Sequence, residues 1–446
     1  MPNIVGPNPT DPDITRSDEW YARAIGVQPP VTQVLAKGPT QFVRGVAPKY
    51  LVRGDGARVW DVDGNEYLDY HMGVGPVSLG YRHPAVDGAI RRQLDDGITF
   101  SLMHPLEVEV SELVAELVPG AEMVRFGKSG AEATSAAIRL ARAYTGRDKV
   151  VSCGYHGWHD WYIGTLPPKA GVPTAVQELI STFAYNDLAS LEAAIDDETA
   201  AVIMEPMTFD WPDPGFLEGV KEIAHRHGAL FVMDEIWTGF RWALGGAQEY
   251  FGVIPDLATV SKGMGNGVPI SALVGPREIM RVLDGTVFFY STFGGEALAL
   301  AGTKATLEVM RDEPVHEHLE RLGGRLRDGY NALAASHGLA DVTACKGHGA
   351  RTLVTFAGDA DPLVQKSLVQ QELIRDGILW TGFHTMCWAH TDDDVDYTLG
   401  AWDRALAALA VALESSDPAI HLRGDPIEPV FRAATGFHTK PKEPAR

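Results

Sequence analysis

The chain has 446 residues, of which 45% are hydrophobic, and its formal net charge at pH 7 is -21. This hydrophobic content excludes a disordered chain, and no apolar run approaches the ~20 residues that a membrane-spanning helix needs. The negative charge makes nucleic acids and anionic membranes poor partners. A chain of this length can form two or three domains with at least one large core.

The cysteines and the N-terminus both bear on the compartment. Cys153, Cys345 and Cys387 lie far apart and form no CxxC motif, which fits free thiols in a reducing compartment better than disulfides or a zinc site. The first residues, MPNIVGPNPTDPDITRSDEW, lack the basic and apolar regions of a signal peptide. We therefore expect a cytoplasmic protein.

Residues 1–71 are expected to belong to a smaller domain. The first 40 are rich in Pro, Asp and Thr and predict an extended arm with one short helix at Ser17–Ile25. Tyr50–Tyr70 then alternates polar and apolar residues around Gly-Asp-Gly and Asp-Gly-Asn turns, which predicts a β-meander.

Residues 72–335 are expected to form a large α/β domain, because helical periodicity alternates there with short apolar runs. That alternation predicts a mostly parallel sheet covered by helices on both faces. The expected strands are Met123–Phe126, Lys149–Ser152, Ala200–Met204, Leu230–Met233, Leu257–Val260 and Ile270–Val274. The expected helices are Ala85–Asp95, Pro105–Leu117, Ala131–Tyr144, Gly295–Val309 and Val315–Ala335.

Residues 336–446 are expected to complete the smaller domain, which is α+β and includes the early meander. Short strands and a helix precede a final amphipathic helix, Thr391–Leu413. The tail, Ser415–Arg446, is rich in proline and has little periodicity.

Asp234 and Lys262 each end an apolar run of a predicted buried strand. A buried carboxylate and a buried amine are costly unless something pairs with them. A pyridine ring that carries an aldehyde would pair with both, because the carboxylate would keep the ring nitrogen protonated and the lysine would form a Schiff base. Without Asp234, Lys262 would be interpreted as a solvated lysine at a strand end, because lysines are usually solvated. The pair indicates an enzyme that uses pyridoxal 5'-phosphate.

Two segments predict anion-binding geometry. Ser129 and Glu132 have the S-x-x-E spacing of a capping box, so the amides of Gly130 and Ala131 begin a helix and can bind a phosphate. The alternative is a box that only caps the helix. A second such segment contains Thr292 before a Gly-Gly pair. A symmetric dimer that places this segment across its interface would explain both.

The loop Ser152–Gly164 combines aromatic and histidine side chains after a strand. Tyr155 can stack on a flat cofactor ring, and His156 stands beside it. A metal site at this loop is disfavoured because no further ligands with metal spacing follow. The GxGxG run after Lys262 lacks the spacing and the acidic residue of a dinucleotide loop. We expect no metal and no dinucleotide.

Six motifs in this order resemble the class III aminotransferases, within them the branch around glutamate-1-semialdehyde aminomutase. They are RFGKSGAEAT, YHGWHDW, IMEP, MDEIWTGFR, TVSKGMGNGVPISALVG and STFGGEALALA. The resemblance runs from about Gly38 to Arg432. It implies a fold-type I pyridoxal-phosphate homodimer with a large domain of the seven-stranded type, a smaller α+β domain, and active sites at the subunit interface. The implied reaction moves an amino group between a small amino donor, expected to carry a carboxylate, and a carbonyl acceptor.

The resemblance also assigns residues. Lys262 matches the Schiff-base lysine, Asp234 the partner of the pyridine nitrogen and Tyr155 the stacking aromatic. Arg44 falls where the aminomutase branch binds a substrate carboxylate, although an ion pair is the alternative. The other matches to cofactor contacts are Ser129, Gly130, Ala131, His156, Glu205, Ile236 and, from the neighbouring chain, Thr292.

Several departures from the pattern surround the substrate. Ala131 replaces a hydroxyl residue of the phosphate loop, Val74 a tryptophan, and Trp237 a glutamine. Gly382 falls at a glutamate of the aminomutase, with His384 close by. Arg44, Trp158, Trp237 and His384 are therefore the candidate substrate contacts. We expect an intermolecular aminotransferase. The alternatives are an intramolecular aminomutase, a decarboxylase or racemase, and a silent cofactor-binding protein, which would have lost the lysine or the aspartate.

Overall fold

The computed structural model describes residues 10–167, 169–207 and 209–429, and the predictions for the arm and the tail extend beyond these residues. The described residues form two compact units. Unit 1 comprises residues 10–83 and 317–429, and unit 2 comprises residues 84–316. The contacts thus divide the chain after residues 83 and 316, where the sequence predicts boundaries after 71 and 335. Residues 72–83 join unit 1 because Tyr81 pairs with Gly56 and the Trp388 amide donates to Ser78.

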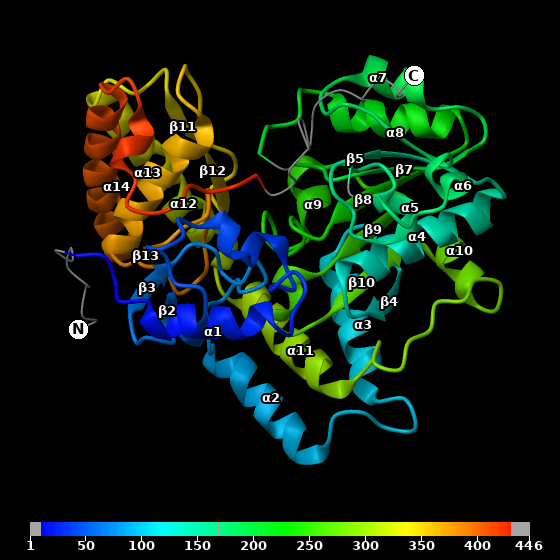
Figure 1. Cartoon of the computed structure of the whole chain (residues 1–446). Coiled ribbons are helices and arrows are strands. Elements are labelled where there is room, and N and C mark those ends of the chain that lie inside the picture. Colours follow the sequence, from blue (N-terminus) through cyan, green and yellow to red (C-terminus); the bar gives the residue numbers. More distant parts are fainter. Residues whose placement is uncertain (1–9, 168, 208, 430–446) are drawn as a thin grey trace. The chain divides into compact units, whose positions relative to one another are not determined.

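Unit 2 is built around a seven-stranded sheet with the order β4-β10-β9-β8-β7-β5-β6 (Figure 1). The strands from β9 to β6 pair in parallel, and β10 pairs antiparallel with β4 and β9. The predicted, mostly parallel α/β sheet is confirmed. Its strands are β4 Met123–Gly127, β5 Lys149–Cys153, β6 Ile180–Thr182, β7 Thr199–Met204, β8 Leu230–Glu235, β9 Leu257–Val260 and β10 Ser271–Gly275.

The sheet is buried along its central strands, because every residue of β7, β8, β9 and β10 is buried. Helix α4 packs on β7, β9 and β10, and α8 packs on β7 and β8 (Figure 1). The helices are α2 Pro84–Asp96, α3 Pro105–Leu117, α4 Gly130–Thr145, α5 Asp160–Ile163, α6 Thr174–Gln177, α7 Leu188–Ala194, α8 Phe216–Arg226, α9 Ala247–Phe251, α10 Arg277–Met280 and α11 Ala297–Asp312.

Unit 1 contains two smaller sheets. The predicted meander forms β1 Leu51–Asp55, β2 Arg58–Asp61 and β3 Glu66–Asp69, and β13 Ile378–Leu379 pairs in parallel with β3. The second sheet is antiparallel and contains β11 Thr343–Lys346, β12 Arg351–Phe356 and β14 Phe383–Thr385. The helices are α1 Thr15–Ile25, α12 Val315–Ser336, α13 Pro362–Arg375 and α14 Asp392–Leu413.

The interior of unit 1 is aromatic. Tyr330 and Trp380 both lie edge-on to Trp402, and all three are fully buried. Among the described residues, no helix is both long and apolar enough to cross a membrane. The three cysteines are buried free thiols.

Candidate active site

The carboxyl ends of β8 and β9 bring together the two residues that the sequence singles out. The strands pair in parallel, with Asp234 opposite Thr259. Lys262 follows β9 by two residues and opens the short 3-10 turn Lys262–Gly265. Asp234 and Lys262 therefore lie at the same edge of the sheet, which is where open α/β sheets bind their ligands.

Asp234 is held by a buried hydrogen-bond network. Its Oδ2 lies 2.7 Å from Nδ1 of His156, and the exposed fractions of the two side chains are 2% and 0%. Its Oδ1 accepts the amide of Ile236 at 3.1 Å and the hydroxyl of Thr259 at 3.4 Å. An ionised carboxylate only accepts hydrogen bonds, so Nδ1 of His156 carries the proton of this pair. The carboxylate is thereby fixed in orientation.

The neighbouring acid, Glu235, is satisfied inside the protein. Its carboxylate accepts the hydroxyl of Thr238 at 2.8 Å, the Gln248 side-chain amide at 2.9 Å, and the backbone amides of Ala247 and Gln248. Burial raises the pKa of Glu235 above its usual value. Of the two adjacent carboxylates, Glu235 thus ties β8 to α9, and Asp234 belongs to the candidate site.

Lys262 is oriented by the ring of Trp237 and by its own backbone. Its Nζ lies 3.6 Å from the centroid of that ring, within the range of a cation–π interaction. Its φ of 39° lies in the left-handed region, which non-glycine residues adopt only where the surroundings impose it. Ser261 helps to impose it, because its hydroxyl donates to the carbonyl of Ile270 at 2.6 Å.

The N-terminus of α4 lies next to the end of β8. Ser129 and Glu132 form the predicted capping box, so the helix begins at Gly130. A Cβ built on Gly130 would lie 3.1 Å from the side chain of Ile236, two residues beyond Asp234. Because that box takes up the amide of Glu132, the amides of Gly130 and Ala131 are the ones that a helix N-terminus offers to an anion.

Tyr155 stands on a tightly packed loop after β5. Its amide donates to Oε1 of Glu205 at 2.8 Å. A Cβ on Gly154, whose φ is 109°, would lie 2.9 Å from the same oxygen. Glu205 therefore fixes the backbone that presents the Tyr155 ring. The residue Tyr155 is 42% exposed. Burial of the hydroxyl end raises the pKa of Tyr155.

Two predicted residues of unit 2 are exposed and have few partners among the residues that the structure describes. Trp158 is 69% exposed and meets His159 edge-on. Thr292 is exposed in the loop before α11. Their predicted roles as substrate contact and as phosphate contact of a neighbouring chain stay predictions.

The two predicted residues of unit 1 are bound by neighbours of that unit. Arg44 forms ion pairs with Glu428 at 2.8 Å and with Asp425 at 3.4 Å. His384 is fully buried, its Nδ1 lies 3.0 Å from the hydroxyl of Thr352, and its Nε2 accepts the indole N–H of Trp402 at 3.0 Å. Burial lowers the pKa of His384 to about 3. This geometry favours the ion-pair reading of Arg44 and a core role for the neutral His384.

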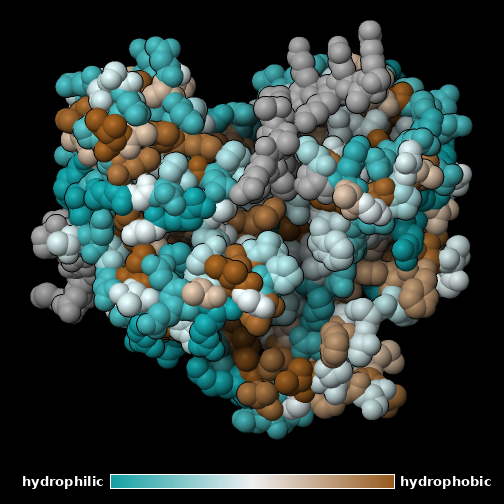
Figure 2. Space-filling view, viewed as in Figure 1, coloured by the Kyte–Doolittle hydropathy of each residue, from teal (hydrophilic) through white to brown (hydrophobic). Residues whose placement is uncertain are grey.

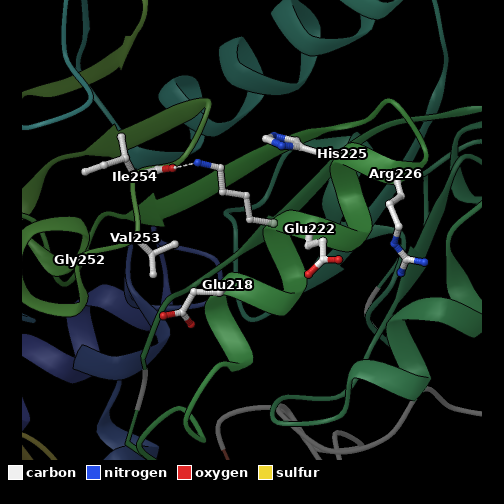
Figure 3. Close-up of a pocket in the computed structure, with 8 residues that line it drawn as sticks. Glu218, Glu222, His225, Arg226, Gly252, Val253 and Ile254 are labelled. Atoms are coloured by element: carbon white, nitrogen blue, oxygen red, sulfur yellow. Dashed lines mark hydrogen bonds between the residues drawn. The ribbon is translucent and has the colours of Figure 1, made fainter.

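The sequence interpretation missed Thr259, which contacts Asp234 from the adjacent strand. The available signal was a polar residue inside the apolar run Leu257–Val260, at the position opposite Asp234. A second feature that the sequence did not suggest is a surface hollow beside α8 (Figure 3). Its lining mixes acidic and basic side chains, Lys221 is bound to the carbonyl of Ile254 at 2.8 Å, and no predicted site residue lines it.

Comparisons with known proteins agree with this geometry. The family model described as aminotransferase class-III matches residues 43–389. The chain is 37% identical over 383 residues to the 3-aminobutyryl-CoA aminotransferase of Cloacimonas acidaminovorans (strain Evry), covering 83% of this chain and 91% of that protein.

Two solved structures are similar over most of the chain. The first is the FumI protein of Sphingopyxis sp. MTA144, solved in its PLP internal aldimine form, with a TM-score of 0.84, 30% identity, and coverage of 92% of this chain and 100% of that one. The second is a glutamate-1-semialdehyde aminomutase from Pseudomonas aeruginosa PAO1, with a TM-score of 0.78, 26% identity, and coverage of 88% and 94%.

Proposed function

Since the chain belongs to the class III aminotransferases, which use pyridoxal phosphate, we propose that Asp234 and Lys262 are its catalytic residues. One observation carries this proposal. Asp234, which is paired with buried His156, lies opposite Thr259 on the adjacent parallel strand. Thr259 comes three residues before Lys262, so Asp234 and Lys262 lie at the edge of the sheet where ligands bind.

The residues at this edge fit the cofactor. The carboxylate of Asp234 can hold the proton of a pyridine nitrogen, and Nε2 of His156 is a buried nitrogen without a hydrogen-bond partner among the described residues. The N-terminus of α4 can bind the phosphate through Gly130 and Ala131, with the Ser129 hydroxyl beside them. Tyr155 offers a ring for stacking. Glu205 and Ile236 hold these two elements in place.

When bound, pyridoxal phosphate supplies an aldehyde that takes up an amino group and a protonated ring that accepts electrons. Asp234 would keep the ring nitrogen protonated, and His156 keeps Asp234 oriented. Lys262 would act as the general base that takes a proton from the substrate carbon. The ring of Trp237 attracts the ammonium form that Lys262 adopts each time it takes that proton.

A homodimer in which Thr292 reaches the partner's site is part of the proposal. Large apolar side chains are exposed on residues 94–108 and 288–293, namely Leu94, Ile98, Phe100, Leu102, Met103, Val108, Phe288, Tyr290 and Phe293. A hydrogen bond joins the first segment to the start of α11, which follows the second segment: the amide of Ala297 donates to the carbonyl of Ile98 at 2.9 Å. Apolar side chains gather over α2 in the space-filling view (Figure 2). Such a surface supports a protein partner, and Thr292 lies in it.

The amino donor is proposed to be a small molecule that carries a carboxyl group or a derivative of one. The relative from Cloacimonas acts on 3-aminobutyryl-CoA by its name, which suggests an amine on the second carbon from a carbonyl. The aminomutase branch is the second candidate, and the similarity to the solved aminomutase is the observation behind it. An aminomutase needs one compound alone, whereas an aminotransferase needs a separate acceptor.

The test uses the purified enzyme with single amino donors and no acceptor. Absorbance should show conversion of the cofactor to its aminated form, together with one equivalent of the keto product. Addition of a carbonyl acceptor should restore the starting spectrum. Release of an isomer from one compound, with no keto product, would replace the proposal with the aminomutase.

A further inference from the structure

The segment 288–296, which precedes α11, combines exposed side chains with a bound backbone. Three of its large side chains are more than half exposed, namely Phe288, Tyr290 and Phe293. A guanidinium nitrogen of Arg125, on β4, donates to the carbonyl of Phe289 at 2.8 Å. A guanidinium nitrogen of Arg139, on α4, donates to the carbonyl of Phe288 at 2.8 Å. The backbone of the segment is therefore held by β4 and α4, while much of its side-chain surface stays exposed.

A partly buried ion pair holds the end of this segment. Oε1 of Glu296 lies 2.9 Å from Nζ of Lys128, and the two side chains are 10% and 18% exposed. The same carboxylate accepts the amides of Leu298 and Ala299 at 2.8 Å and 3.1 Å, so it also caps α11. Lys128 lies between β4 and α4, where its own amide donates to Oε2 of Glu132 at 2.6 Å. The pair thus joins the start of α11 to the start of α4.

The segment also packs closely against the carboxyl end of β4. A Cβ built on Gly294 would lie 3.2 Å from the carbonyl oxygen of Phe126. A Cβ built on Gly127 would lie 3.4 Å from the ring of Phe289. The turn that is proposed to bind the phosphate, Ser129–Ala131, follows this strand end. The segment is therefore in contact with the strand that leads into that turn.

We propose that Lys128 and Glu296 are positioning residues for the phosphate of the cofactor. Their ion pair fixes the segment that presents Thr292 relative to the start of α4. This inference rests on the proposed function, in which the start of α4 binds the phosphate of its own subunit and Thr292 contacts the phosphate of a second copy. Neither charged side chain has to touch a phosphate, because each charge already compensates the other. Hydrogen bonds to a phosphate depend steeply on geometry, so a displaced segment or turn weakens them.

A direct contact between Lys128 and the phosphate would reverse the effect of one variant. Glu296→Gln removes the negative charge that binds the ammonium of Lys128. If Lys128 bound the phosphate itself, this change would free the ammonium and tighten cofactor binding. If the pair positions the two segments, the change loosens them and weakens cofactor binding. Tighter binding in Glu296→Gln would therefore overturn the positioning role.

The test compares two ligands in equilibrium dialysis of the purified full chain. One is pyridoxal phosphate, and the other is pyridoxal, which has the same ring and aldehyde without the phosphate. Lys128→Met should weaken binding of pyridoxal phosphate about 10-fold, because hydrogen bonds to a charged group become longer. Binding of pyridoxal should change less than about 2-fold. Equal weakening of both ligands would indicate a general effect on the fold and would overturn the proposal, as would unchanged binding of pyridoxal phosphate.

Further variants test whether the two charged residues act together. Glu296→Gln should weaken binding of pyridoxal phosphate by a similar factor. The double variant should bind no more weakly than either single variant, because each change removes the same interaction. Lys128→Arg keeps the charge and should keep most of the affinity. Single effects that add in the double variant would overturn the pair.

The matched control is Lys149→Met. It removes a lysine whose Nζ lies 2.6 Å from the carboxylate of Asp196, at the amino end of β5. The proposed site lies at the carboxyl end of the strands, so this variant should bind both ligands as the wild type does. A loss of pyridoxal phosphate binding in Lys149→Met equal to that in Lys128→Met would overturn the specific role of Lys128.

Thr292→Val tests the segment through which the pair acts. In this background the phosphate contact of the segment is already lost. Lys128→Met should therefore weaken binding of pyridoxal phosphate less than it does in the wild-type background. An undiminished effect would overturn the role of the segment.

Ser129→Ala separates a failure of this inference from a failure of the proposed function. The Ser129 hydroxyl is proposed to lie beside the phosphate, so its loss should weaken binding of pyridoxal phosphate and not of pyridoxal. If Ser129→Ala does so and the variants of the ion pair do not, only this inference fails. If none of these variants distinguishes the two ligands, the proposed phosphate site is wrong and the inference fails with it.

Discussion

The sheet edge of unit 2 and the interior of unit 1 both bury ionisable side chains, but they satisfy them differently. At the sheet edge, an acid pairs with a side chain from another segment, as Asp234 of β8 does with His156 of the loop after β5. In unit 1, His384 is neutral and bound at both ring nitrogens, and Lys366 has no counter-ion within residues 10–167, 169–207 and 209–429. A buried ionisable group therefore indicates a functional site only when its hydrogen bonds leave it able to take part in a reaction.

The largest expected effect comes from Lys262. Lys262→Ala should lower kcat by about 10⁴-fold, because it removes the group that carries the proton. The enzyme should keep its fold and should lose the cofactor more readily on gel filtration, followed by absorbance. Lys169→Ala is the control for loss of a lysine. A variant with near wild-type activity would remove the sheet edge from the mechanism.

The next effect separates the two adjacent carboxylates of β8. Asp234→Asn should lower kcat by about 10²- to 10³-fold with little change in stability, because it removes a charge aimed at the cofactor. Glu235→Gln should instead lower the free energy of unfolding by about 1–3 kcal/mol, because it leaves buried donors unsatisfied. Steady-state kinetics and urea unfolding measure the two. The reverse pattern would exchange the roles given to these residues.

A smaller effect is expected at the ring above Lys262. A cation–π contact contributes about 0.5–2 kcal/mol, so Trp237→Leu should slow the half-reaction with the amino donor about 2- to 30-fold. Trp237→Phe keeps a ring, and its rate should fall between those of the wild type and Trp237→Leu. Stopped-flow absorbance measures the rate. Equal rates for Leu and Phe would mean that the ring packs against Lys262 without assisting it.

The sequence alone located the sheet edge, because the strand pattern is local. Six strands of unit 2 were predicted within a few residues, and Asp234 and Lys262 follow from them. Strand β6, Ile180–Thr182, was missed because it is short and half-buried, so it has no apolar run. The side-chain partners of Arg44 in unit 1 could not be predicted, because Asp425 and Glu428 lie near the other end of the chain.

Lys366 shows the same limit from another side. In the sequence it is one polar residue of a helix, and lysines on helices are usually solvated. Only the folded unit places it beside Trp380 and Gly382. Long-range packing decides which charged residues are buried, and a single sequence does not contain that information in a local pattern.

The histidines of unit 1 predict a dependence of stability on pH. Burial lowers the pKa of His71 and His384 to about 3 and that of His390 to about 4, from 6.5. Below pH 6.5 the unfolded chain binds protons that the folded chain excludes, so the stability present above 6.5 is lost as the pH falls towards 4. Each histidine should contribute a slope of about 1.4 kcal/mol per pH unit.

His384→Gln isolates one of these contributions, because glutamine can still donate to Thr352 and accept from Trp402. Urea unfolding between pH 7.5 and pH 4.5 should show a slope that is shallower by about 1.4 kcal/mol per pH unit. An unchanged slope would mean that His384 is protonated in the folded chain. That result would also reopen its role as a substrate contact.

The smallest expected effect concerns Arg44, and it tests whether unit 1 contains a substrate arginine at this position. The guanidinium already binds Glu428 at 2.8 Å and Asp425 at 3.4 Å, and a third of its side chain is exposed. A partly exposed ion pair contributes about 0–1 kcal/mol. Arg44→Gln should therefore change the KM of the amino donor less than about 3-fold. A much larger rise in the KM of the amino donor for Arg44→Gln would mean that Arg44 contacts the substrate, because loss of a partly exposed ion pair does not account for it.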